Sequence, residues 1–131
     1  MGLLETIGLW LINEAKATAL GTDIFLDYTP PDGNCITLYE YGDTPQTLQV
    51  NALHRGIQVQ VRNTSPSTAK QFSWELYKLF KEHQDEDARI NFTPSSWGQV
   101  LLRTAPMKLK VDDKNQIYWT FNLGITTNIL G

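Results

Sequence analysis

The chain contains few of the residues that catalyse reactions or bind metals. Its 131 residues include one cysteine, Cys35, and two histidines, His54 and His83. A lone cysteine cannot form a disulfide within the chain or supply the several thiolates of a structural zinc site. The histidines have neither H-x-x-x-H nor H-x-H spacing, and no glycine-rich phosphate loop or G-x-S-x-G motif is present. The sequence therefore predicts no cofactor, no metal site and no catalytic residues.

Charged residues are also scarce, at 19% of the chain against about 25% in typical soluble domains. This scarcity indicates that part of the surface is buried against partners. The net charge of −3 does not mark a nucleic-acid-binding protein. An acidic protein can still line a channel through which DNA passes, because weak attraction suits passage.

A helix that spans a membrane needs about 20 consecutive apolar residues, and no apolar run in the sequence approaches this length. The apolar N-terminus is interrupted by Glu5, and no positive charge precedes it as in a signal peptide. We therefore expect no membrane association. Cys35 is interpreted as a small buried hydrophobe at the start of a strand, in a reducing compartment.

Two segments have the apolar spacing of helices. Residues 3–19 carry an apolar stripe that is widened by Trp10, so the helix is expected to be sandwiched in the core or to meet a second subunit. Ser65 followed by Pro66 is typical of a helix N-terminus. The second helix is expected to run to about His83.

The remaining regular segments read as strands separated by turns. The strands are expected at Cys35–Tyr41, Gly56–Asn63, Val100–Arg103, Ala105–Lys110 and Gln116–Asn128, with a short one near Ile90–Phe92. Residues 1–131 are thus expected to form one α+β domain with two layers. A mostly antiparallel or mixed sheet of four to six strands would be packed by two main helices.

Period-2 alternation in the second strand predicts its two faces. Ile57, Val59 and Val61 are expected in the core, and Gln58, Gln60 and Arg62 are expected to face solvent or a neighbouring subunit. Lysines on the strand from Ala105 to Lys110 are interpreted as edge protection. The candidate interface residues are Trp10, Asp43, Gln46, His54, Arg55, Gln58, Gln60, Arg62, Trp97 and Arg103.

Two long polar segments, Gly42–Arg55 and Gln84–Ser96, are expected to be loops that supply contacts to partners. Two other classes of protein remain open. A small soluble α+β enzyme would use a loop acid with His54 or His83, and a host-directed adaptor would bind one bacterial protein as a monomer.

Several short motifs follow one another in a fixed order. They are Asn34-Cys35-Ile36, Leu38-Tyr39-Glu40-Tyr41, Gly42 with Pro45, Gly56–Arg62 and the closing Phe121-Asn122-Leu123. With the helix after the fourth motif, they resemble a phage protein family often labelled minor capsid protein. The sheet of that family is similar to that of tail-terminator proteins of long-tailed phages.

The resemblance implies a non-enzymatic virion assembly protein. Members of such families cap the growing tail tube, typically as a hexameric ring, and form the surface that joins tail to head. The implied partners are other copies of the chain, the tail tube and head-connector proteins, with only passive contact to passing DNA. The implied location is the virion and, during assembly, the cytoplasm of the bacterial host.

Overall fold

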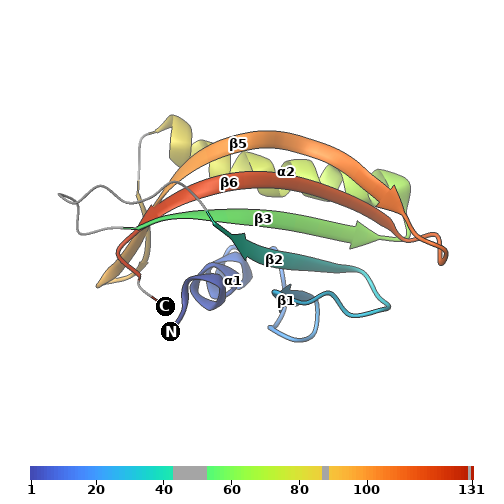
Figure 1. The fold of residues 1–131 in the computed structure, drawn as a ribbon, viewed down its shortest axis with the longest axis horizontal. Coiled ribbons are helices and arrows are strands. Elements are labelled where there is room, and N and C mark those ends of the chain that lie inside the picture. The colour runs from blue at the N-terminus through green and yellow to red at the C-terminus, as the bar shows by residue number, and fades with distance from the viewer. Residues whose placement is uncertain (43–52, 87–88, 130) are drawn as a thin grey trace.

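The computed structural model describes residues 1–42, 53–86, 89–129 and 131. Two helices and six strands occur within these residues (Figure 1). In chain order they are α1 (Leu3–Asn13), β1 (Ile24–Leu26), β2 (Cys35–Tyr41), β3 (Leu53–Asn63), α2 (Pro66–Asp85), β4 (Ile90–Thr93), β5 (Ser96–Val111) and β6 (Ile117–Thr127).

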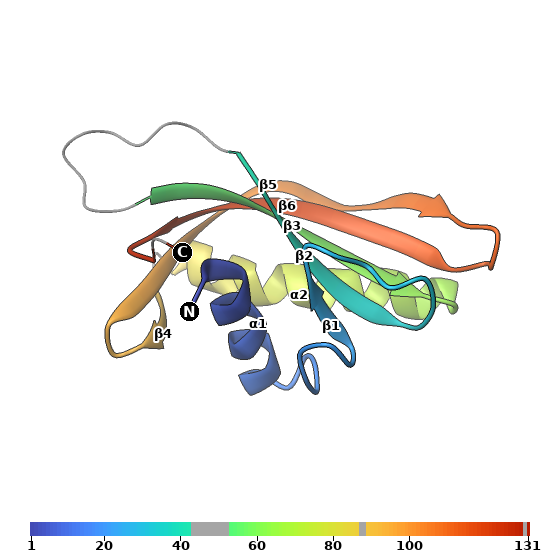
Figure 2. The same cartoon turned by 60° about the horizontal axis from the view of Figure 1, so that its bottom comes forward.

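The strands form one sheet in the order β1-β2-β3-β6-β5-β4. Strand β1 runs parallel to β2, whereas each of the other neighbouring pairs is antiparallel. Both helices pack on the same side of this mixed sheet (Figure 2). The α+β class, the two layers and the mixed sheet that the sequence predicts are confirmed.

The core lies between the sheet and the helices. Ile57, Val59 and Val61 of β3 are at most 1% exposed, as the alternation predicts. Helix α2 begins as predicted, because Ser65 Oγ accepts a hydrogen bond from the amide of Thr68 and Pro66 occupies the first turn. An aromatic cluster joins the layers, and its members are Trp10 of α1, Tyr77 and Phe80 of α2, and Phe121 of β6.

The prediction of a first helix over residues 3–19 is wrong in its C-terminal part. Helix α1 ends at Asn13, and Ala15 has a positive φ of 59° that turns the chain away. The carboxylate of Asp23 then accepts hydrogen bonds from the amides of Thr18 and Ala19. These side-chain contacts satisfy backbone groups that a longer helix would have paired internally.

Strand β2 has the predicted bounds, but two other strands are longer than predicted. Strand β3 begins at Leu53 rather than Gly56, so the segment Gly42–Arg55 is not all loop. Strand β5 is one strand of 16 residues rather than two, with register shifts against β6 on both sides of Pro106. The bulges absorb the proline, because a residue outside the ladder needs no amide donor.

The second predicted loop, Gln84–Ser96, also contains regular structure. Helix α2 continues to Asp85, and β4 forms a tight hairpin with the start of β5. The short strand expected near Ile90–Phe92 is confirmed as β4.

Candidate interaction surfaces

The sheet has one face that neither helix covers. Residues of β3 on this face are paired with β2 and β6, so that Gln58 lies between Tyr39 and Asn122. These side chains, with Tyr41, line a shallow hollow of about 480 Å³. Polar and aromatic side chains around an open hollow suit contact with another protein more than they suit enclosure of a small ligand.

Gln60 and Arg62 lie on this face as predicted, but they are not exposed to solvent. Gln60 is 7% exposed and Arg62 is 1% exposed. The turn that follows β1 folds over them, and Gln60 Nε2 donates a hydrogen bond to Thr29 Oγ1 at 3.1 Å. The prediction that these two side chains face solvent is therefore wrong, because residues 29–33 bury them.

Arg62 holds that turn on the sheet. Its Nε donates to the carbonyl oxygen of Gly33 at 2.8 Å, and its Nη1 donates to the carbonyl oxygen of Pro30. The guanidinium also lies 5.8 Å from the centre of the Tyr118 ring. Its Nη2 has no hydrogen-bond partner among the described residues. Arg62 thus acts as a buried structural cation within the chain.

Tyr118 connects Arg62 to the carboxylate of Asp112. The phenolic oxygen of Tyr118 donates to Asp112 Oδ2 at 3.1 Å and lies 3.5 Å from Arg62 Nη1. Desolvation raises the pKa of Asp112, but hydrogen bonds from Gln116, Lys114 and Tyr118 outweigh this effect and hold the pKa below its usual value. Asp112 is therefore ionised at neutral pH and orients the Tyr118 hydroxyl.

Arg55 faces the helices rather than the open side of the sheet. Its guanidinium pairs with Glu40 at 2.6 Å and donates to the carbonyl oxygens of Ile129 and Gly131 at 3.1 and 2.6 Å. The carbonyl oxygen of Gly131 also accepts from the amide of Leu3. Arg55 thereby joins both ends of the chain, which lie side by side in Figure 1, to β2 and β3.

Trp10 packs against other aromatic rings of the same chain. It is 9% exposed, and its ring lies 5.2 Å from Phe80, 5.6 Å from His83 and 6.2 Å from Phe92. Of the two expected places for the first helix, the structure thus puts the Trp10 face in the core. Trp97 is half-buried, and the guanidinium of Arg89 stacks 3.9 Å from its ring centre.

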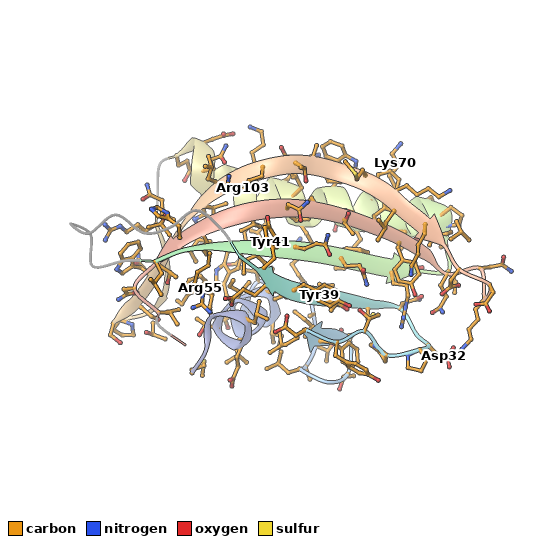
Figure 3. The ribbon with its side chains drawn as sticks, viewed as in Figure 1. Asp32, Tyr39, Tyr41, Arg55, Lys70 and Arg103 are labelled. Atoms are coloured by element: carbon orange, nitrogen blue, oxygen red, sulfur yellow. The ribbon has the colours of Figure 1, made fainter. Side chains whose placement is uncertain are left out.

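The four remaining candidate residues do not form one cluster in the described part of the chain. Arg103 is exposed on β5, and Figure 3 labels it on the side opposite Asp32. His54 lies on β3, where its Nδ1 is 2.7 Å from Thr126 Oγ1. Asp43 and Gln46 lie outside the described residues.

Sequence reasoning missed the apolar character of the β5 edge. Beyond Gly98, no described strand pairs with β5 on the side away from β6. Four large apolar side chains there are between 47% and 56% exposed, and these are Leu101, Met107, Leu109 and Val111. The interpretation of Lys108 and Lys110 as edge protection agrees with the position of β5, but the sequence does not predict that the apolar side chains between them are exposed.

Substitution of Gly56 tests whether the Tyr41 ring packs against β3 on the open face of the sheet. A Cβ at Gly56 would overlap the ring of Tyr41, so we expect Gly56→Ala to displace that ring and to lower the free energy of unfolding by about 1 kcal/mol. The loss is measured by urea denaturation. Gly42→Ala is the matched control, because nothing lies within 4 Å of a Cβ built there. An equal loss from Gly56→Ala in a Tyr41→Ala background would contradict this account.

Neither a cluster of metal-ligating side chains nor a membrane-spanning helix occurs in the part of the chain that the structure describes. No group of three or more histidine, cysteine, aspartate or glutamate side chains is placed to hold a metal ion in residues 1–42, 53–86, 89–129 and 131. In the same part of the chain, no helix is long and apolar enough to span a membrane. Cys35 is buried as predicted, and burial raises the pKa of its thiol.

Comparison with known proteins agrees with a role in assembly. Residues 11–129 match the family model described as "Bacteriophage tail terminator protein". A comparison with curated proteins gives no match. Since the matched segment spans nearly the whole chain, from the end of α1 through β6, this protein belongs to the bacteriophage tail terminator family, a family of structural phage proteins that act in tail assembly.

Proposed function

We propose that this chain is a non-enzymatic, ring-forming domain that caps the phage tail tube and provides the surface that joins tail to head. Six copies would form a hexameric ring in the virion, assembled in the host cytoplasm. The tail tube and head-connector proteins would be its partners, and DNA would pass through the ring without specific contacts. The segments Gly42–Arg55 and Gln84–Ser96 would contribute contacts to the ring or the tube.

The observation that carries the ring is the unpaired edge of β5. A long edge strand with large exposed apolar side chains invites association, and soluble monomers usually hide or shorten such an edge. Association of identical subunits through different surfaces closes into a ring when the rotation between them permits. The family match supports a role in phage tail assembly, in which a ring of this kind would act.

The proposal is tested on the purified full chain, alone and mixed with tail tubes from an infection that lacks this gene. Light scattering and electron microscopy should reveal a hexameric ring, in solution or at the tube ends. A protein that stays monomeric and leaves the tube ends bare would overturn the proposal and favour the adaptor. His83→Ala is the control and should assemble like the wild type, because the enzyme alternative can use His83 and this residue lies outside the two proposed contact segments.

A further inference from the structure

The two lateral edges of the sheet carry opposite charge. We define the β5 edge as residues Leu101–Val111, which contain three basic residues, Arg103, Lys108 and Lys110, and no acidic one. We define the β1 edge as residues Asp23–Asp32, which contain the three acidic residues Asp23, Asp27 and Asp32 and no basic one. Strands β2, β3 and β6 separate the two edges, so the charges lie on opposite sides of the subunit (Figure 1).

Apolar surface accompanies the charge on both edges. The β5 edge exposes Leu101, Met107, Leu109 and Val111. The β1 edge exposes Tyr28, which is 58% accessible and contacts the ring of Phe25 with centroids 6.4 Å apart. Interfaces commonly combine an apolar centre that includes a tyrosine with a charged rim.

Neither edge is suited to a continuous backbone ladder with a neighbour. Strand β5 shifts register against β6 at three places and contains Pro106, which lacks an amide hydrogen. Strand β1 has three residues, and the carbonyl oxygen of Ile24 already accepts from the amide of Gly21. Contact between these edges would therefore be made by side chains.

Charge also decides which edges meet. Two copies joined β5 to β5 would oppose three cations with three cations, and a β1-to-β1 contact would oppose carboxylates. A β5-to-β1 contact instead pairs unlike charges, and such complementarity both attracts the correct surfaces and rejects the wrong ones. Asp32 forms an exposed ion pair with Lys114 at 2.7 Å, which offsets part of its charge within the chain.

We infer that the β5 edge of one copy docks on the β1 edge of the next copy, in a head-to-tail arrangement that repeats around the ring. This inference rests on the proposed ring function and names the surfaces that form it. A contact between two different surfaces leaves both edges of each subunit occupied when the ring closes.

Charge reversal at each edge separately tests the inference. The first variant carries Lys108→Glu and Lys110→Glu, which change the net charge of the β5 edge from +3 to −1. The second carries Tyr28→Lys, Pro31→Lys and Asp32→Lys, which change the net charge of the β1 edge from −3 to +1. Asp27 is retained, because its carboxylate accepts from the amide of Glu40 and its φ is 55°. All five replaced side chains are exposed, so both variants should fold.

Each variant alone should fail to form rings, in solution and on tail tubes, because its altered edge repels the unaltered edge of the next copy. A 1:1 mixture should recover rings of alternating variants, since each edge then meets one of opposite charge. Light scattering and electron microscopy measure both results. Lys78→Glu with Lys81→Glu is the matched control on α2, with the same change in net charge, and should assemble like the wild type.

The outcomes separate this inference from the proposed function. Rings of wild-type protein together with rings of either variant alone would overturn the edge assignment and leave the ring proposal standing. Rings of the second variant alone would show that the β1 edge is not part of the ring contact. Absence of wild-type rings both in solution and on tubes would overturn the ring proposal and this inference together.

Discussion

Replacement of Arg62 by alanine is expected to lower the free energy of unfolding by about 3 kcal/mol, measured by urea denaturation. The guanidinium is 1% exposed and donates to two backbone carbonyl oxygens of the turn that covers it. Hydrogen bonds from a charged donor are worth about 1.5–3 kcal/mol. Truncation removes these bonds and also leaves a cavity beneath residues 29–33.

The same change should loosen the turn over the sheet. Arg62 is the side chain that links β3 to both Pro30 and Gly33. We expect amide hydrogen exchange to rise at Thr29, Asp32 and Gly33, the residues of this turn that carry an amide hydrogen, more than at β6. Exchange that rises equally in both places would indicate a general loss of stability instead of local release.

Two substitutions separate the contributions of Arg62. Arg62→Met keeps much of the side-chain volume and removes a charge that is buried without direct contact to a carboxylate, so its cost should be about half that of Arg62→Ala. Gln58→Ala is the control on the same face of β3, since Gln58 is only partly buried, and should cost about 0.5 kcal/mol or less. Equal losses for Arg62→Ala and Gln58→Ala would contradict a structural role for the guanidinium.

Arg62 also shows what sequence pattern can predict about a strand. Alternation assigns Val61 and Arg62 to opposite faces correctly, because side chains in a strand alternate strictly. It does not predict that a turn about 30 residues earlier covers the polar face. The Pro30-Pro31-Asp32-Gly33 sequence indicates a turn, but the surface on which the turn rests depends on long-range hydrogen bonds that no local pattern encodes.

Strand β5 illustrates a second limit. Pro106 suggests a break between two strands, because proline cannot donate in the interior of a ladder. The structure instead places it in a bulge at the sheet edge, where its missing amide breaks no bond to β6. Which strand lies at the edge follows from the complete strand order, and that order is a property of the whole fold.

Helix α1 shows the opposite case, in which local pattern continues past the true end of an element. Its apolar stripe includes Ala15 and Ala19, yet the helix ends at Asn13. Ala17 and Leu20 still pack against the core after the chain has turned. Apolar spacing predicts which residues are buried. In residues 14–20 the apolar side chains remain packed against the core although the backbone is no longer helical.

The largest loss of stability is expected from Phe80→Ala, at about 4 kcal/mol. Phe80 is fully buried, and its ring lies 5.2 Å from Trp10 of α1 and 6.1 Å from Phe121 of β6. It therefore connects both helices and the sheet in one contact cluster. Deletion of the ring leaves a cavity that none of these three elements can fill without moving the others.

Two further variants test whether the loss depends on the buried ring of Phe80: a conservative substitution of Phe80 itself and removal of a more exposed ring on the same helix. Phe80→Leu keeps most of the apolar volume and should cost about 1.5 kcal/mol. Trp74→Ala removes a larger ring from the same helix, but Trp74 is 36% exposed and should cost about 1 kcal/mol. A smaller loss from Phe80→Ala than from Trp74→Ala, in urea denaturation at matched conditions, would show that α2 is held to the sheet by other contacts.

The position of Phe80 also gives its substitution a consequence for assembly. Trp10 fixes α1 through Phe80, and α1 in turn packs beside β1, whose edge is proposed to receive the next subunit. Hydrogen exchange in α1 should therefore rise in Phe80→Ala more than exchange in β3. If assembly requires a fixed β1 edge, Phe80→Ala should also weaken ring formation at temperatures where the variant is still folded. Trp74→Ala, which leaves the Trp10–Phe80 contact intact, should not.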